Sequence, residues 1–278
     1  MKENIPAPAN PFIAAPFTVV RKEYITPHYL RIFLTGERVA EIAETTVGIN
    51  NKIIIPPAGT ENFTMPKMNL ETKSWEYPGT DSKPIIRTYT HRGIDLDKKE
   101  IWIDFVVHGD EGPASAWAIN SNPGDALGVM MKRGKKELYS PAEHYVLVGD
   151  ATAIPVIGAI LEDLPESARG VAILEVYGEN EEQFLDTKAD IEIIWTHNSH
   201  PQKGSNLASI LKQRELPIAS RFAYVAAEFS TIKEIRNYLR KEQGWEREEL
   251  YAYSYWKSGV AEDRSVTDRR TEMVKDDG

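Results

Sequence analysis

The chain lacks cysteine altogether, with none among its 278 residues. This absence excludes disulfides, thiol chemistry and cysteine-ligated iron–sulfur clusters. Any electron that the protein moves must therefore travel on a bound organic cofactor or on a metal held by other ligands. We predict no metal site, because the histidines show no metal-ligand spacing with carboxylates. Five of the 6 histidines are interpreted as structural or solvated residues: His28, His91, His144, His197 and His200.

Long apolar segments are also missing. No run approaches the length of a membrane span, and the N-terminal stretch MKENIPAPANPF lacks the hydrophobic centre of a secretion signal. We therefore expect a cytoplasmic protein that does not enter a membrane. The net charge of −9 and the pI of about 5.3 argue against a general nucleic-acid binder, which needs a basic face.

What is present divides the sequence into two parts. The chain is 41% hydrophobic and 27% charged, which indicates a globular protein with a substantial core. The first part is a series of strands separated by turn residues, which is typical of an antiparallel barrel. In the second part strands alternate with helices, which predicts a parallel sheet covered by helices. We predict domains at residues 1–140 and 141–260, a charged tail at 261–278, and a polar loop at 59–83.

The expected elements follow from apolar runs and their periodicity. In the first part we predict strands at residues 30–34, 52–56, 84–90, 101–107 and 126–131. In the second part we predict strands at residues 144–149, 170–178, 191–197, 222–228 and 250–256, and helices at 151–163, 207–211 and 232–239.

The second part has no Gly-x-Gly-x-x-Gly fingerprint of dinucleotide-binding folds. In its place, Gly149-Asp-Ala-Thr-Ala-Ile-Pro follows the first expected strand of this part. Such a turn offers backbone N–H groups and Thr152 at a helix N-terminus, where anions are favoured. The alternative is a plain strand-to-helix turn with Thr152 as its N-cap. We favour a ligand site, because ligands of open sheets gather at the carboxyl ends of the strands.

One hexapeptide, Arg-Thr-Tyr-Thr-His-Arg, starts at Arg87. On an extended strand Arg87 and Tyr89 share one face, whereas Thr88, Thr90 and Arg92 point the other way unless the strand ends. A strand ending here could place guanidiniums on a diphosphate, the tyrosine ring on a flat heterocycle and a hydroxyl near a ring nitrogen. Arginine binds phosphate oxygens bidentately, which lysine cannot do. The alternative is an ordinary strand end with two solvated arginines.

The hexapeptide resembles the flavin-binding motif Arg-x-Tyr-(Ser/Thr)-x-Arg of the ferredoxin-reductase-like flavoproteins. Further segments follow in order: Asp104-Phe-Val-Val-His-Gly, Gly112-Pro-Ala-Ser-Ala-Trp-Ala, Pro123-Gly-Asp, Gly149-Asp-Ala-Thr-Ala-Ile-Pro, Ala226-Ala-Glu and Tyr255-Trp-Lys-Ser-Gly. Together they resemble the siderophore-interacting protein family, the ferric-siderophore reductases, over residues 15–260. The resemblance implies an antiparallel β-barrel that binds FAD, followed by an α/β parallel-sheet domain that binds NAD(P)H.

The resemblance also implies roles for individual residues. FAD would be held by the motif residues Arg87, Thr88, Tyr89, Thr90 and Arg92, with Tyr89 and Thr90 at the reactive ring. Further FAD contacts would come from Asp104, Val106 and His108 on the next strand, and from the pyrophosphate turn at Gly112, Ala114 and Ser115. Asp150, Thr152 and Ala153 would face the nicotinamide cofactor, and Trp256 would lie against the flavin. The alternatives are a satisfied structural histidine for His108, and core packing for Trp117 and Trp256.

The activity implied is electron transfer by FAD from NADPH, NADH or a ferredoxin to iron(III) bound by a siderophore, which releases iron(II) in the cytoplasm. Iron(II) is a softer ion that matches hard oxygen ligands poorly, so reduction unloads it. A flavin carries both hydride and single-electron chemistry. Some relatives bind the phosphate of NADPH near the end of the third strand. Here Trp195-Thr-His-Asn-Ser-His offers no arginine and Lys203 is the nearest cation, so the choice between NADH and NADPH stays open.

Ferric siderophores are often anionic, and an acidic protein needs a local positive patch to attract them. We predict that Lys52, Arg133 and Lys257 bind the siderophore. The remaining cations at residues 132–136 are also explained by a solvated hairpin. Two other functions are compatible with parts of the sequence: a general flavin or ferredoxin-type reductase, and a siderophore-binding protein without turnover or flavin. We expect a monomer.

Overall fold

The structure of the protein is a computed structural model. It describes residues 11–57, 60, 63–69, 71–72, 74–76, 84–109 and 112–260. The predicted tail at 261–278 and about half of the predicted loop at 59–83 lie outside the described residues, and the described part of that loop contains a short strand pair. The chain forms two compact units. The first comprises the chain up to Lys22, Ile32–Ile103 and Gly109–Lys136; the second comprises Glu23–Arg31, Asp104–His108 and the chain from Glu137 onward.

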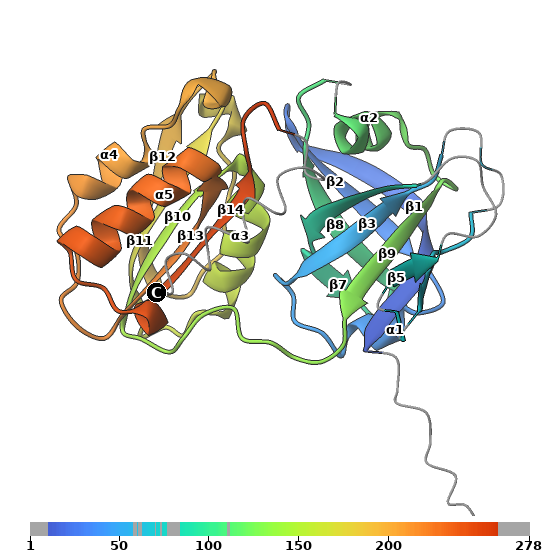
Figure 1. The fold of residues 1–278 in the computed structure, drawn as a ribbon, viewed down its shortest axis with the longest axis horizontal. Coiled ribbons are helices and arrows are strands. Elements are labelled where there is room, and N and C mark those ends of the chain that lie inside the picture. Colours follow the sequence, from blue (N-terminus) through green and yellow to red (C-terminus); the bar gives the residue numbers. More distant parts are fainter. Residues whose placement is uncertain are drawn as a thin grey trace, which may run out of the picture. The chain divides into compact units, whose positions relative to one another are not determined.

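A seven-stranded sheet dominates the first part of the chain, in the order β6-β3-β9-β1-β2-β8-β7 (Figure 1). Its strands are β1 (Phe12–Thr26), β2 (Tyr29–Thr35), β3 (Asn50–Ile55), β6 (Ile85–Thr90), β7 (Gly93–Asp95), β8 (Glu100–Val106) and β9 (Ala126–Lys132). The pairings of β9 with β1 and β3, of β3 with β6 and of β7 with β8 are antiparallel, as predicted. A separate antiparallel pair joins β4 (Lys67–Asn69) and β5 (Ser74–Glu76).

Two short helices accompany this sheet and lie at opposite ends of it in Figure 1: α1 (Val39–Ile42) and α2 (Pro113–Asn120). Alternating apolar residues fill the inside of the sheet, for example Ile101, Ile103 and Phe105 on β8, which have no exposed surface. The longest strand, β1, was not among the predicted strands. Pro16 lies within it, and proline normally argues against a strand interior.

The second part of the chain forms a five-stranded sheet in the order β12-β11-β10-β13-β14, and every pairing in it is parallel. Its strands are β10 (His144–Asp150), β11 (Arg169–Val176), β12 (Asp190–His197), β13 (Arg221–Glu228) and β14 (Leu250–Trp256). Its helices are α3 (Ile154–Asp163), α4 (Leu207–Lys212) and α5 (Phe229–Asn237). The predicted parallel sheet with helices between its strands is confirmed. None of the helices within the described part of the chain is both long and apolar enough to cross a membrane.

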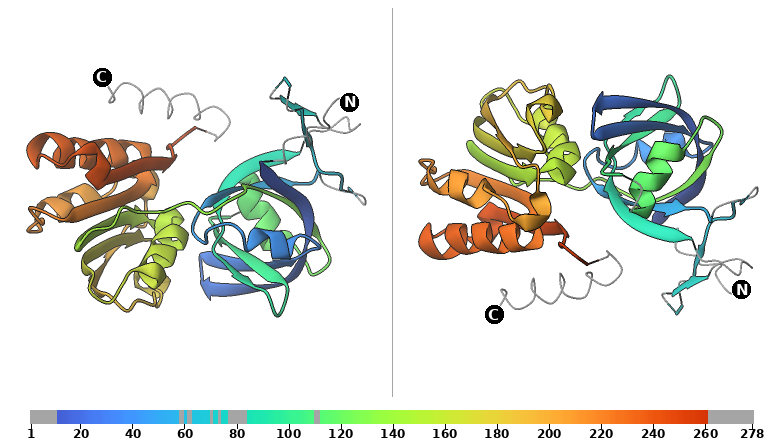
Figure 2. Two further views of the ribbon diagram at one scale, coloured as in Figure 1. Left: turned by 90° about the horizontal axis from the view of Figure 1, so that it is seen from below. Right: turned by 90° about the horizontal axis from the view of Figure 1, so that it is seen from above.

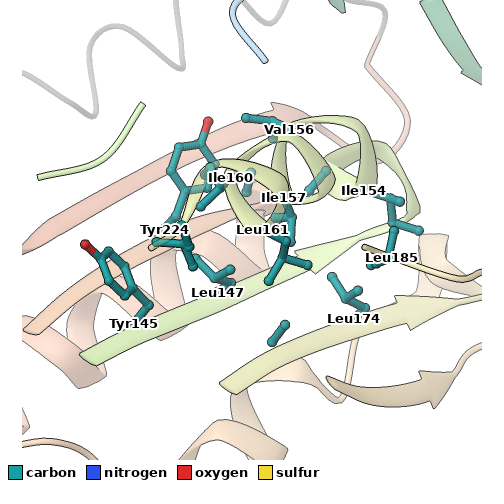
Figure 3. Packing of buried hydrophobic residues seen from close by; sticks show 14 of the residues in the cluster. Tyr145, Leu147, Ile154, Val156, Ile157, Ile160, Leu161, Leu174, Leu185 and Tyr224 are labelled. Atoms are coloured by element: carbon teal, nitrogen blue, oxygen red, sulfur yellow. The ribbon is translucent and has the colours of Figure 1, made fainter. Parts of the chain in front are cut away.

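Helices cover both faces of the parallel sheet, with α3 on one face and α5 on the other (Figure 2). Successive side chains on each strand serve opposite faces. Leu147, Leu174 and Tyr224 pack with α3 in the core shown in Figure 3, whereas Val146 and Val225 pack in the core of α4 and α5. Burial on both faces explains why these strands are nearly continuous apolar runs in the sequence.

The boundaries of two predicted helices need correction. Residues 151–153 form a 3-10 turn before α3 begins at Ile154, so the predicted helix at 151–163 has an irregular start. The helix predicted at 232–239 begins earlier, at Phe229, because the Glu228 side chain accepts the backbone N–H of Ser230 and caps it. It then passes into a wider turn, Tyr238–Glu242.

Candidate functional site

The motif residues lie at the end of β6, as expected. In the pairing with β3, Arg87 lies opposite Ile53 and Tyr89 opposite Asn51. This register confirms that Arg87 and Tyr89 share one face of the sheet, and that Thr88 serves the other. Strand β6 ends at Thr90, so Arg92 lies beyond the regular strand.

Hydrogen bonds and burial fix the motif locally. Lys52 Nζ donates to Thr88 Oγ1 at 2.5 Å, and Arg87 Nη1 donates to the carbonyl oxygen of Ile86 at 2.8 Å. Thr90 is buried, with 6% of its surface exposed, whereas Arg87 and Tyr89 are half-buried. The motif therefore combines a buried threonine at the strand end with an arginine and an aromatic ring that are only half-buried.

The predicted pyrophosphate turn is the start of helix α2. Gly112 is its N-cap in an extended conformation, and no side chain of the described residues caps this helix. Ala114 and Ser115 are buried in its first turn, and Ser115 Oγ donates to the carbonyl oxygen of Gly109 at 2.6 Å. Gly109 has φ of +89°, a left-handed conformation that favours glycine. Small residues and a helix N-terminus without a side-chain cap fit a diphosphate, because backbone N–H groups there attract anions.

The next predicted FAD contacts differ in exposure. Asp104 is buried and forms a bidentate ion pair with Arg31, with Nε–Oδ1 and Nη2–Oδ2 distances of 2.7 and 2.8 Å. Burial lowers the pKa of Arg31, but the hydrogen bond and charge of Asp104 outweigh burial, so the pKa of Arg31 is raised overall. Val106 is half-buried and His108 is exposed after the end of β8. A ligand that used Asp104 would have to share it with Arg31.

Asp150 ties together the ends of three parallel strands. Its Oδ1 accepts hydrogen bonds from Thr152 N at 2.9 Å and Thr152 Oγ1 at 2.5 Å. Its Oδ2 accepts from Glu228 N at 3.0 Å and from Trp256 Nε1 at 2.7 Å. Burial raises the pKa of Asp150, while the donors on Thr152 and Trp256 favour the ionised form. Asp150, not Thr152, caps the turn that follows β10, so the alternative of a Thr152 N-cap is wrong.

Trp256 and Ala153 are placed in different ways. Trp256 is half-buried at the end of β14, and its indole N–H is held by Asp150. Ala153 is fully buried beneath Gly149, where an added Cβ would come within 2.5 Å of the Ala153 Cβ. The methyl group of Ala153 therefore packs inside the turn, and a ligand could contact only the backbone of this residue.

Two carboxylates at this edge of the sheet were not expected from the sequence. Glu175 lies opposite Asp150, one residue before the end of β11, and is buried. It accepts hydrogen bonds from Asn198 Nδ2, Ser205 Oγ and Asn206 N at 3.0, 2.9 and 3.1 Å. Glu228 ends β13, is buried, and accepts from Ser230 N at 2.6 Å. Glu228 belongs to the Ala226-Ala-Glu segment of the family resemblance, which assigned it no role, whereas an acidic residue near the end of an apolar strand was the only signal for Glu175. The hydrogen-bond partners of Glu175 are distant in sequence, and the partner of Glu228 is a nearby serine, a residue type that indicates no particular role.

The predicted siderophore-binding cations have protein partners. Lys52 bonds Thr88, as described above. Arg133 forms ion pairs with Glu41 and Glu44, the second at 3.0 Å. Lys257 Nζ lies 4.8 Å from the centre of the Phe229 ring, a cation–π distance. Arg133 would have to release its carboxylates to bind an anion.

The histidines take structural positions. His28 Nδ1 lies 2.6 Å from Glu181 Oε1, and His197 Nε2 lies 2.8 Å from Glu182 Oε1. Within the described ranges, no group of three or more histidine, aspartate and glutamate side chains is arranged to hold a metal ion. His91 differs from the others, because it is fully buried and neither ring nitrogen has a hydrogen-bond partner within the described chain.

We expect His91 to make the stability of the fold depend on pH. Burial, with a smaller contribution from the charge of Lys135, lowers its pKa from 6.5 to about 4. Below pH 6.5 the unfolded chain takes up a proton that the folded chain refuses, so stability falls until about pH 4. The loss is about 3 kcal/mol over this range. Urea unfolding at both ends of the range measures it, and the His91→Gln variant should lack this component. An equal pH dependence in both proteins would contradict the assignment.

Both parts of the chain match models of known protein families. A sequence model of the siderophore-interacting FAD-binding domain matches residues 18–136, and one of the siderophore-interacting protein matches residues 142–259. The ferric vibriobactin reductase ViuB of Vibrio cholerae is 32% identical over 256 residues, which cover 91% of this chain and 93% of that protein. The crystal structure of a siderophore utilization protein from T. fusca is 32% identical, with a TM-score of 0.80 over 91% of this chain and 95% of that one.

More distant structures share the fold alone. A ferredoxin NADP+ reductase from Neisseria gonorrhoeae, solved with FAD and NADP, is 12% identical, with a TM-score of 0.59 over 87% of this chain and 98% of that one. The predicted fold class, an antiparallel barrel followed by an α/β domain as in ferredoxin reductases, is confirmed.

Proposed function

Because the chain belongs to the siderophore-interacting protein family, we propose that it is a ferric-siderophore reductase that uses FAD. The predicted family is confirmed by the family models and by the similarity to ViuB. The reductase activity is our proposal. One observation carries it: a chain that matches a ferric vibriobactin reductase over nearly its whole length also holds the flavin motif at the end of a rigid strand. When bound, FAD would supply the conversion between a hydride pair and the single electrons that iron takes.

The residues present fit FAD, and we assign roles on that basis. Arg87 and Arg92 would bind the diphosphate, together with the backbone at the N-terminus of α2. Tyr89 would lay its ring against the isoalloxazine, and the buried Thr90 hydroxyl would donate to a ring nitrogen.

The proposed electron donor is NADPH or NADH, with a ferredoxin as the alternative. The turn from Asp150 to Ala153 supports a nicotinamide cofactor, because it lies at the carboxyl end of β10, where ligands of open parallel sheets bind. Asp150 would act through its hydrogen bonds, which hold Thr152 and Trp256 in fixed positions. The ring of His197, at the end of β12, is paired with Glu182, so a second phosphate would meet a carboxylate there.

Positive side chains should matter for an anionic siderophore, and we expect Lys52→Ala and Lys257→Ala each to raise the Michaelis constant several-fold at low salt. Each variant removes one positive charge from an acidic protein that must attract an anion. Steady-state kinetics at two ionic strengths measure the effect, which salt should weaken. The control is Lys212→Ala, which removes an exposed lysine paired with Glu234 on the helical face. A Michaelis constant unchanged at low salt would remove both lysines from the substrate site.

The activity itself can be tested by the production of iron(II). The purified chain should bind FAD and turn yellow. Without oxygen it should form an iron(II)–chelator complex from a ferric siderophore when NADPH or NADH is supplied. A colourless protein that FAD cannot reconstitute would rule out the reductase and favour a siderophore-binding protein. A yellow protein whose flavin is reduced by NADPH or NADH but which forms no iron(II) would favour a general flavin reductase.

A further inference from the structure

One side chain of the flavin motif and one on the neighbouring strand β3 are buried and polar. Asn51 on β3 is 2% exposed and His91, which follows β6, is 0% exposed. Both the oxygen and the nitrogen of the Asn51 amide, and both nitrogens of the His91 ring, have no hydrogen-bond partner within the described chain. Buried polar atoms are rarely left in this state, because each loses its bonds to water on folding.

The sheet register brings the two side chains to the same face. Asn51 lies opposite Tyr89. The ladder continues one step further, where His91 N donates to the carbonyl oxygen of Ile49 at 2.8 Å. Side chains two positions apart on an extended strand share a face. Asn51 and His91 therefore lie on the same side of the sheet as Tyr89.

The backbone around His91 is fixed from both directions. Its carbonyl oxygen accepts Gly48 N at 2.7 Å, and the following residue, Arg92, donates its N–H to the carbonyl oxygen of Trp102 at 3.1 Å. The loop before β3 is held in turn by Lys135, whose Nζ donates to the carbonyl oxygens of Ala43 and Thr45. Because this backbone is held on both sides, a movement of the His91 ring would also move Thr90 and Arg92, its neighbours in the motif.

We propose that an ordered water molecule bridges the Asn51 amide and the His91 imidazole, and that these two residues position the end of β6 for the flavin. A buried water makes two to four hydrogen bonds, and this pair offers both donors and acceptors for it. The ring of His91 is neutral in the fold, so it presents one donor and one acceptor. The positioning role rests on the proposed binding of FAD, whereas the bridging water does not.

A double-mutant cycle tests the bridge. Asn51→Leu and His91→Leu each leave one polar partner buried and unpaired, so each should raise the unfolding equilibrium constant about tenfold or more. The double variant removes both polar groups and should be no less stable than the single variants. The cycle is measured by urea unfolding of the full chain at pH 8, where the imidazole is neutral. Additive effects, or single variants as stable as the wild type, would overturn the bridge. Crystallographic density for an ion in place of water would also overturn it.

The affinity for FAD and the visible flavin spectrum test the positioning role. Both should change in the single leucine variants, with FAD bound about tenfold more weakly, and both should be restored in His91→Gln, which keeps a donor and an acceptor. The matched control is Trp245→Phe, which removes another buried, unpartnered N–H from the second unit and should leave FAD binding unchanged. FAD binding that is equal in all variants would overturn the positioning role. A wild-type chain that binds no FAD would instead refute the proposed function, while the cycle would still test the bridge.

Discussion

The Arg87→Ala variant is expected to bind FAD at least a hundredfold more weakly than the wild type. The guanidinium is placed on the same face of β6 as Tyr89, where it would bind diphosphate oxygens in two charge-assisted hydrogen bonds. Such bonds contribute about 1.5–3 kcal/mol each, and two of them account for a factor of a hundred or more. Isothermal titration of the flavin-free protein with FAD measures the change.

The Arg87→Lys variant sharpens this prediction. Lysine keeps the charge but loses the planar fork, so it should recover only a small part of the affinity. The matched control is Arg214→Lys on the second unit, where an exposed arginine forms an ion pair with Glu192. Its FAD affinity should equal that of the wild type. If Arg87→Lys bound FAD as tightly as the wild type, bidentate recognition by Arg87 would be excluded.

Asp150→Ala is expected to lower the free energy of unfolding by about 3 kcal/mol or more. The substitution strands four donors in a buried setting: the backbone N–H groups of Thr152 and Glu228, the Thr152 hydroxyl and the Trp256 indole. A buried donor left unpaired costs about 1–3 kcal/mol, and relaxation or entering water offsets part of the sum. Urea unfolding followed by tryptophan fluorescence measures the loss.

Two further variants distinguish the loss of the Asp150 hydrogen bonds from the effect of removing a negative charge. Asp150→Asn keeps one acceptor oxygen, so its loss of stability should be intermediate. Glu192→Gln removes an exposed carboxylate that pairs with Arg214, and it should change stability by less than about 1 kcal/mol. An Asp150→Ala protein with wild-type stability would show that the carboxylate does not join the three strand ends.

Local patterns in the sequence were enough for the main features of the fold. Apolar runs of strand length, separated by helical spacing, predicted the parallel sheet, because both faces of its strands are buried. Alternation along β6 predicted which motif side chains share a face, and the register with Ile53 and Asn51 confirmed it. Helix α2 was expected only as a turn, because Gly112-Pro113 resembles a loop. Proline is nevertheless well suited to the first position of a helix, where its missing N–H costs nothing.

The partners of the site residues could not be predicted, because they depend on contacts between distant segments. Asp104 on β8 is paired with Arg31 on β2, and Arg133, just after β9, is paired with Glu41 on helix α1. Asn51 looked like an ordinary polar residue before an apolar run, and only the register with Tyr89 places it beside the motif. Neither the composition of the chain nor the spacing of its residues shows which distant side chains come into contact.

The most direct test of the central claim is the reoxidation of the reduced flavin by a ferric siderophore, followed in a stopped-flow instrument without oxygen. The FAD-loaded protein is first reduced, and its flavin absorbance is then recorded after mixing with the siderophore and an iron(II) chelator. A ferric-siderophore reductase should recover the oxidised flavin at a rate that rises with siderophore concentration, and should form about two iron(II) per flavin, because the reduced flavin carries two electrons. Reoxidation no faster than in buffer, across a panel of catecholate, hydroxamate and carboxylate siderophores, would contradict the assignment of iron as the electron acceptor.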